Sequence, residues 1–283
     1  MTSSTLRQHP TLHAEVVRRA PLPVFGKVFT DSWRSLIGWG LGIAAASFLY
    51  LPLFPSMSGD SGMQDLIDSL PPELTKTINY DQIGTGAGYA EATMFGLIGF
   101  LLMSIAAISW GAATLGGDEE SGQLELTLAH GVTRVQVAVA RFAALVVKIL
   151  ALAGLAFVLV FVLNEPSQLG INPVNLLGTS LLFGGLILLN GTVALLCGAL
   201  TGRRIWGIGG GTFVAVIGYV FNAIGNQNAN LEWLHALSPY NWAFGNHPMT
   251  NGANCGTVIA FYCISLVLGA ATALALRQRD VGV

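Results

Sequence analysis

The sequence predicts an all-α, polytopic membrane protein with six transmembrane helices, because its composition, its apolar stretches and the placement of its basic residues agree. Of its 283 residues, 53% are hydrophobic and only 10% are charged, with a mean hydropathy of +0.63. An ordinary soluble domain carries about a quarter charged residues. The formal net charge of -2 gives no basic excess for nucleic acid, so we expect the lipid bilayer, and no nucleic acid, as a partner.

Six apolar stretches are each long enough to cross the hydrocarbon core of a bilayer, which takes about 20 helical residues. They cover residues 35–54, 90–115, 142–163, 174–200, 205–224 and 256–276. Only Thr201, Gly202, Arg203 and Arg204 separate the fourth stretch from the fifth. Two arginines are costly inside a bilayer and common at its edge, so we expect a tight turn there. The chain then divides into an N-terminal segment, 1–34, and a transmembrane domain, 35–283.

The basic residues predict the orientation of these spans, because Lys and Arg accumulate in cytoplasmic loops. One face of the predicted bundle carries nearly all of them: Arg7, Arg18, Arg19, Lys27, Arg34, Arg134, Arg141, Arg203, Arg204, Arg277 and Arg279. Lys148 enters the third span from this face and can extend back to the interface, which leaves Lys76 on the other face. We therefore expect a multi-pass protein of the cell (inner or plasma) membrane with both termini in the cytoplasm.

Three segments outside the spans carry further signals. Residues 23–34 mix apolar and charged side chains in a pattern suited to a helix on the membrane surface, within the cytoplasmic N-terminal segment. Residues 63–70, in the first outer loop, have the apolar spacing of a short amphipathic helix. In the last outer loop, Trp233, Tyr240 and Trp242 are aromatic residues that prefer the headgroup layer, so we expect part of this loop to enter the interface.

The loop between the second and third spans is the most informative polar segment. It has three consecutive acids followed by leucines spaced by four: Asp118, Glu119, Glu120, Leu124 and Leu128. This pattern predicts a short helix across the membrane surface with its carboxylates at the N-terminal end, where the helix dipole favours negative charge. Gly131 can end the helix and turn the chain toward the third span. One face of this helix would be exposed to the cytoplasm.

At these residues the sequence resembles the permease subunits of type-2 ABC exporters. In that family the loop typically reads two glutamates, a glycine, a leucine and a glutamate, more leucines, then a proline and a later arginine. The matching residues are Glu119, Glu120, Gly122, Leu124, Glu125, Leu126, Leu128 and Arg134, while Gly131 stands in place of the proline. Family members also carry an outer segment similar to residues 70–74 and a Gly-Tyr pair like Gly88 and Tyr89. The resemblance covers nearly the whole chain.

The resemblance implies that this loop is a coupling helix, which fits into a groove of a separate nucleotide-binding ATPase subunit and passes its movement to the spans. The partner-binding residues would be Asp118, Glu119, Glu120, Gly122, Leu124, Glu125, Leu128 and Arg134. It also implies a permease for the efflux of an amphipathic small molecule. ATP and Mg would then be bound by the partner subunit, and this chain would hold no cofactor.

The chain itself lacks the residues that ATP hydrolysis requires. A Walker A loop needs GxxxxGK followed by Ser or Thr, and none of the three lysines, Lys27, Lys76 and Lys148, stands in that context. The sequence also has no HExxH motif, no CxxC spacing and no recognisable Ser, His and Asp arrangement. We therefore expect a transport subunit with no catalytic residues and no metal site, and not an enzyme.

Glycine spacing predicts where a second subunit could pack. An engine of two ATPases needs two permease halves, so we expect a dimer with a second copy or a related permease. Gly38 and Gly42 in the first span, and Gly207 and Gly211 in the fifth, are four positions apart, which lets helix backbones approach closely in lipid. These glycines are the candidate dimer interface, and the same spacing serves packing within one subunit equally well.

Polar residues inside the spans are candidates for a substrate path. They are Asn190, Asn222 and, at the outer end of the second span, Glu91. Unpaired polar groups are disfavoured against lipid, so each should face protein or a path. Taken singly, each more often holds helices together.

Two alternative functions stay open at this point. A secondary transporter driven by an ion gradient would carry buried carboxylates or broken helices at the midplane, often in repeated halves. No span has a central Asp or Glu, and no internal repeat is clear. A non-transporting membrane anchor would show the same spans and the same docking loop, and only its failure to transport would distinguish it.

Overall fold

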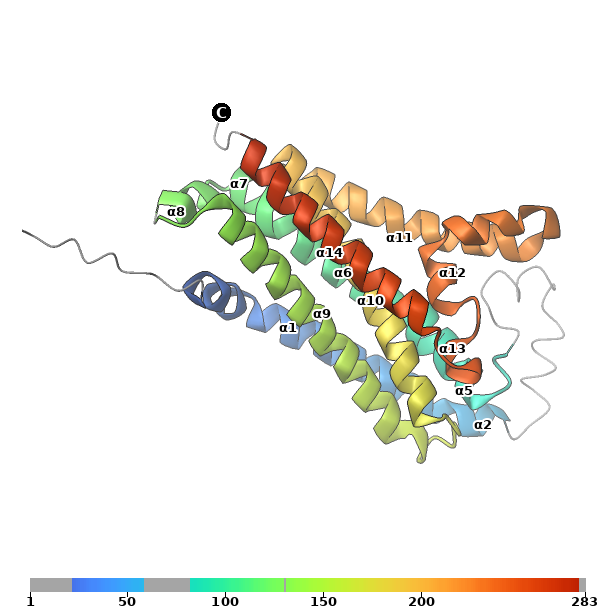
Figure 1. Ribbon diagram of the computed structural model, residues 1–283. Coiled ribbons are helices and arrows are strands. Elements are labelled where there is room, and N and C mark those ends of the chain that lie inside the picture. Colours follow the sequence, from blue (N-terminus) through green and yellow to red (C-terminus); the bar gives the residue numbers. More distant parts are fainter. Residues whose placement is uncertain (1–21, 59–81, 130, 280–283) are drawn as a thin grey trace, which may run out of the picture.

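The computed structural model describes residues 22–58, 82–129 and 131–279, and this part of the chain is a bundle of helices without strands (Figure 1). Six helical segments in it are long and apolar enough to cross a membrane. They are Trp33–Ser56, Gly86–Glu120, Arg134–Asn164, Pro173–Thr201, Arg204–Gln227 and Cys255–Gln278. The predicted all-α membrane fold with six spans is confirmed, and several helices extend further than their apolar stretches.

These segments are built from elements of different lengths. In chain order they are α1 (Leu22–Tyr50), η1 (Leu51–Leu53), α2 (Phe54–Ser58), α5 (Gly86–Ala90), η2 (Glu91–Ile98), α6 (Gly99–Ala112), η3 (Ala113–Gly117), α7 (Asp118–Glu120), α8 (Gln123–Ala129), α9 (Arg134–Asn164), α10 (Pro173–Thr201), α11 (Arg204–Gln227), η4 (Ala229–Leu237), α12 (Pro239–Phe244), α13 (Pro248–Asn251) and α14 (Cys255–Gln278). The second span thus runs without a break from α5 to α7.

The two ends of the bundle differ in composition. One end, which we call the charged end, carries Asp118, Arg141, Arg204 and Arg279, and α7, α8 and the end of α14 lie there (Figure 1). The opposite end carries α2, α5, α12 and α13 (Figure 1). Successive spans alternate in direction, so the described segments that bear arginines meet at the charged end (Figure 1).

The helix α10 is the centre of the bundle. It packs against α6, α9, α11 and α14, and 78% of its apolar window is buried. The corresponding shares are only 28% for the span of α1, 33% for α11 and 28% for α14, so these helices lie at the periphery. A peripheral apolar helix exposes its side chains to lipid or to another subunit.

The predicted surface segment, residues 23–34, is helical, but it forms the first turns of α1 and is not a separate helix. Figure 1 shows these first turns, in dark blue, directed differently from the rest of α1. Their position on a membrane surface stays a prediction. The amphipathic helix expected over residues 63–70 lies outside the described residues.

The second span contains two stretches of wider, π-helical turns that the sequence did not predict. At the end of η2, Gly99 N–H donates a hydrogen bond to Met94 O, five residues earlier. In η3 the corresponding donor is Asp118 N–H, which reaches Ala113 O and Leu115 O. Such turns are rare and occur frequently at functional sites. One of them lies directly before the acidic residues.

The last loop folds back into the bundle, which corrects part of the expectation for its aromatic residues. Tyr240 is buried, and its hydroxyl donates to Gly96 O at 2.9 Å. Ser238 Oγ donates to Gly218 O at 2.5 Å, which fixes the start of α12 against α11. Tyr240 therefore packs inside the protein, since a buried hydroxyl needs a partner. Trp233 is exposed, and its position in the headgroup layer stays a prediction.

Candidate functional site at the charged end

The sequence predicted that the three acids begin a surface helix, and this prediction is wrong. The acids form the last turn of the second span. The residue before them, Gly117, has helical backbone angles of φ -71° and ψ -38°, so the helix continues through α7 to Glu120. The helix dipole disfavours carboxylates at this end. Arg141 and Arg279, from other helices, compensate for it by pairing with Asp118 and Glu119, and these pairings were not predicted.

The short surface helix is instead α8, which begins after a sharp turn at Gly122 with φ +71°. Leu124 is fully buried at 0% exposure, and Leu128 packs against the same core. Leu126 is 65% exposed, and Glu125 is also exposed. The predicted residues Leu124 and Leu128 therefore anchor α8 to its own bundle. The outer face of α8 consists of Gln123, Glu125, Leu126 and Ala129.

The end of α8 matches the prediction for Gly131, which has φ +79° and donates its N–H to Leu128 O at 3.1 Å. A glycine adopts this left-handed conformation without steric cost. The next helix, α9, begins with a capping box in which Thr133 and Gln136 exchange hydrogen bonds between side chain and backbone. The surface segment is thus bounded on both sides by defined turns.

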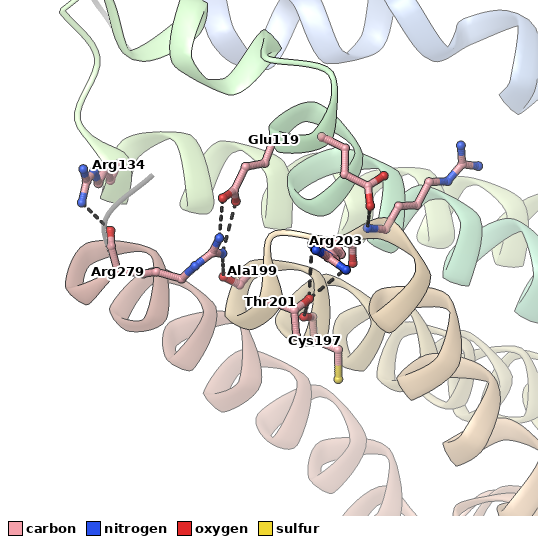
Figure 2. A network of polar contacts seen from close by, with 9 residues as sticks. Glu119, Arg134, Cys197, Ala199, Thr201, Arg203 and Arg279 are labelled. Carbon is pink, nitrogen blue, oxygen red and sulfur yellow. Dashed lines mark hydrogen bonds and ion pairs between the residues drawn. The ribbon is translucent and has the colours of Figure 1, made fainter. Parts of the chain in front are cut away.

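Glu119 and Arg279 form a two-pronged ion pair between the second and sixth spans (Figure 2). Arg279 Nη1 donates to Glu119 Oε2 at 3.2 Å, and Nη2 donates to Oε1. Arg279 Nη1 also donates to Ala199 O at 2.9 Å, near the end of α10. Paired, charge-assisted bonds of this kind are directional as well as strong.

Arg134 also belongs to this network (Figure 2). Its Nη1 donates to the backbone oxygen of Arg279 at 2.6 Å, which connects the start of α9 to the end of α14. The resemblance assigned Arg134 to partner binding, whereas the structure uses this nitrogen within the bundle.

The other two acids bind neighbouring helices. Asp118 Oδ2 accepts a hydrogen bond from Arg141 Nη2 of α9 at 2.6 Å. Glu120 Oε1 accepts one from the backbone N–H of Arg204 at 3.0 Å. Arg204 is the first residue of α11, so Glu120 satisfies an otherwise open helix donor and places a negative charge where the dipole favours it.

The tight turn predicted between the fourth and fifth spans is confirmed, and Gly202 is central to it. Gly202 has φ +69° and ends α10. A Cβ atom at this position would lie 2.5 Å from Glu119 Oε1 and 2.2 Å from Arg279 Nη2. Thr201 Oγ1 also bridges Cys197 O and the N–H of Arg203 across the turn (Figure 2). The turn therefore leaves the space that the ion pair occupies.

The candidate residues for a substrate path are all buried inside the subunit. Asn190 Nδ2 donates to Ser104 Oγ of α6 at 3.2 Å. Glu91 Oε2 accepts the N–H of Met249 at 2.8 Å, and His247 Nδ1 lies 3.2 Å from Glu91 Oε1. Asn222 is buried as well. This arrangement favours the structural reading of these residues, and whether any lines a path in another conformation stays a prediction.

The glycines predicted at a dimer interface fall into two groups. A Cβ atom on Gly207 would lie 2.8 Å from Ala112 Cβ, and one on Gly211 would lie 2.9 Å from Ala194 Cβ, so both pack within the subunit. Gly38 and Gly42 in α1 have open space beside them. On α11, the glycine with open space is Gly209, which the four-residue glycine spacing did not predict.

Lys148 was expected to extend back to the membrane interface, and it does not. Its side chain is only 3% exposed, and Nζ lies 5.2 Å from the centre of the Trp110 ring. Trp110 Nε1 in turn donates to Ser35 Oγ at 3.0 Å. A cation over an indole ring is stabilised by the ring quadrupole. Lys148 therefore connects α9 to α6 and, through Trp110, to α1.

The comparisons with known proteins agree with this architecture. None of the curated proteins compared with the chain matches it. The sequence profile of a family described as ABC-2 family transporter protein matches residues 22–281, which include every described span and the charged end. The chain therefore belongs to the ABC-2 transporter family, as a membrane permease.

Proposed function

We propose that this chain is one permease half of an ABC exporter, and that a separate nucleotide-binding subunit docks on the outer face of α8. ATP and Mg are bound and ATP is hydrolysed in that subunit. The charged end faces the cytoplasm, both termini lie there, and the membrane is the cell membrane. The observation that carries the proposal is the position of α8, which joins the second and third spans and presents Glu125 and Leu126 outward.

Two features support docking at α8. Its inner side is fixed by the buried Leu124, so a force on the helix reaches the bundle and does not only bend a loop. Its outer face carries a large exposed apolar side chain, Leu126, beside the exposed carboxylate of Glu125. An apolar anchor with a charged rim is typical of a protein interface.

A pull-down tests this docking. The permease is purified in mild detergent from its native host, as the unmodified chain and as Leu126→Asp. We expect the unmodified chain to bring down a P-loop ATPase and Leu126→Asp to lose most of it, because an unpaired carboxylate would be buried in the interface. Leu237→Asp is the matched control, since Leu237 is also exposed but lies in η4 at the opposite end. Equal recovery of the ATPase with both variants would contradict the assignment.

Labelling with a membrane-impermeant maleimide tests the orientation. Cys255 is exposed at the start of α14, at the opposite end, while Ala129 is exposed at the end of α8. In a chain whose other cysteines are replaced by alanine, we expect Cys255 to react in intact cells. Ala129→Cys, in a chain without the natural cysteines, should react only after permeabilisation. Reaction of Ala129→Cys in intact cells would place α8 outside, where no ATPase could reach it.

The exposed side of α11 is a candidate surface for a second permease copy. The exposed side of α11 carries Ile205, Trp206, Gly209, Phe213 and Val216, and these residues line an open groove of about 780 Å³. Arg203 lines the groove at its charged end. We infer that a second copy faces this side of α11 together with the open Gly38 and Gly42 side of α1. The enclosed groove, apolar with one cationic end, would then suit an amphipathic substrate.

Disulfide formation tests the dimer. Gly209→Cys, introduced into a chain without its natural cysteines, should form a disulfide-linked dimer in membranes on mild oxidation. Leu266→Cys on α14 is the control, because Leu266 is equally open to the surroundings but lies on another peripheral helix. Cross-linking at Leu266 and none at Gly209 would place the second copy on α14 instead.

A further inference from the structure

Arg279 joins more helices than any other residue of the charged-end network described here. It caps α14, donates to Glu119 at the end of the second span and donates to Ala199 near the end of α10. Its backbone oxygen accepts the hydrogen bond from Arg134 at the start of α9. Figure 2 shows the side chain of Arg279 directed between Glu119 and Ala199. One residue therefore holds four helix ends together.

The Glu119 side chain is mostly enclosed by this arrangement. The Glu119 side chain is 11% exposed, and the Arg279 side chain is 30% exposed. Gly202 leaves the required space, because any larger residue would place its Cβ atom against both partners. A charge pair withdrawn this far from water is screened less than a surface pair and tolerates the loss of one partner poorly.

The Glu119 carboxylate is also close in the chain to α8. Only Glu120, Ser121 and Gly122 separate it from the first residue of α8, and Gly122 N–H donates back to Glu119 O at 3.0 Å. A displacement of α8 must therefore reach the second span at this point. From there, the described side-chain contacts of Glu119 lead through Arg279 to α10 and α14.

Resting on the docking of a nucleotide-binding subunit at α8, we propose that Arg279 is a positioning residue for coupling. It makes the ends of the second span, α10 and α14 move as one body when α8 is displaced. Without the Arg279 guanidinium, the partner subunit still binds and hydrolyses ATP, but the movement of α8 no longer reaches α14. Small shifts are transmitted over such distances by rigid, packed elements that have discrete arrangements.

The test measures the movements of α8 and α14 separately. Spin labels are attached at Thr127 and Val162 in one sample and at Leu274 and Val162 in another. Val162 and Leu274 are exposed, and Thr127 is a half-buried residue of α8 outside the proposed docking face. The natural cysteines are first replaced by alanine, and the complex with its co-purified ATPase is placed in nanodiscs. Distances are recorded without nucleotide and with ATP, Mg²⁺ and vanadate, beside the ATP hydrolysis rate.

We expect both distances to respond to nucleotide in the unmodified complex. In Arg279→Gln, the response from Thr127 should persist while the response from Leu274 falls by about fivefold or more, which is the smallest factor by which a typical coupling energy changes an equilibrium. Arg279→Lys should recover part of the response, because lysine keeps the charge but not the fork of donors. Arg277→Gln is the matched control, since Arg277 is exposed on the same helix end.

Three outcomes separate the possibilities. A full response from Leu274 in Arg279→Gln overturns the role of Arg279. No nucleotide response from Thr127 in the complex without the Arg279 substitution overturns the proposed docking at α8 instead. If Arg279→Gln does not fold, Glu119→Gln approaches the same pair from the other side and must give the same selective loss, and a retained Leu274 response there overturns the inference as well.

Discussion

Asp118 Oδ2 accepts a hydrogen bond from Arg141 Nη2 at 2.6 Å, and this contact joins the end of the second span to α9. The side chains are 18% and 16% exposed, so both charges are largely withdrawn from water. Arg141 Nε is buried and has no hydrogen-bond partner. The Asp118 carboxylate is thus the main compensation that the structure gives for this guanidinium.

Replacing Asp118 with Asn should therefore destabilise the permease by more than a surface substitution would. We expect the free energy of unfolding to fall by about 1–3 kcal/mol, because the buried guanidinium loses its charged acceptor. Reversible unfolding in mixed micelles measures this change. Glu125→Gln on the exposed face of α8 is the control and should change stability by less than about 0.5 kcal/mol. Equal values for the two variants would contradict the structural role of Asp118.

Two of the three leucines of α8, Leu124 and Leu126, should separate folding from docking. Leu124→Ala removes a fully buried side chain and should lower the free energy of unfolding by about 2–5 kcal/mol. Leu126→Ala removes an exposed side chain and should leave the stability of the isolated permease nearly unchanged. Leu126→Ala should nevertheless weaken binding of the ATPase subunit, by more than its small effect on the stability of the permease explains. A stability loss at Leu126 equal to that at Leu124 would mean that α8 packs differently.

The sequence was sufficient for the spans, for the turn at Gly202 and for the family, but not for the contacts at the charged end. Hydrophobic length determines a span almost alone, because lipid allows few other structures. The partner of Glu119 is 160 residues away, and no periodicity specifies such a pair. Three acids next to a face that holds most of the arginines were the available signal, since such charges rarely stay unpaired near a membrane.

The glycines show the same limit in another way. The spacing of Gly207 and Gly211 correctly predicts a close helix contact, but spacing does not say whether the neighbouring helix belongs to the same subunit. The structure places Ala112 and Ala194 of the same chain there. The wide turns of η2 and η3 were not predicted either, because such wide turns carry no fixed sequence pattern.

Gly207→Ala should therefore lower the stability of the subunit, and Gly38→Ala should not. At Gly207 the added methyl would meet Ala112 Cβ and Ala194 O at 2.8 Å, so the helices must separate at a cost of about 1–3 kcal/mol. At Gly38 the methyl has open space, and alanine is the better helix former, so the stability of the single subunit should stay equal or rise slightly. Unfolding of each variant in dilute micelles measures this, and a larger loss at Gly38 would contradict the packing described for α11.

Asn190 and Ser104 offer a test of whether a buried polar residue holds the spans together. Asn190 Nδ2 donates to Ser104 Oγ at 3.2 Å, while Asn190 Oδ1 is buried without a hydrogen-bond partner. Ser104→Ala would leave both polar ends of the amide unpaired. We expect a loss of about 0.6 kcal/mol, the average for hydrogen bonds between transmembrane helices, and of no more than about 1.7 kcal/mol. The double variant Ser104→Ala/Asn190→Leu removes both polar groups and should recover most of this loss, because two apolar groups need no partner. If the loss in the double variant equals the sum of the losses in Ser104→Ala and Asn190→Leu measured separately, the two side chains act independently. Asn190 would then need another reason for its place at the centre of the bundle.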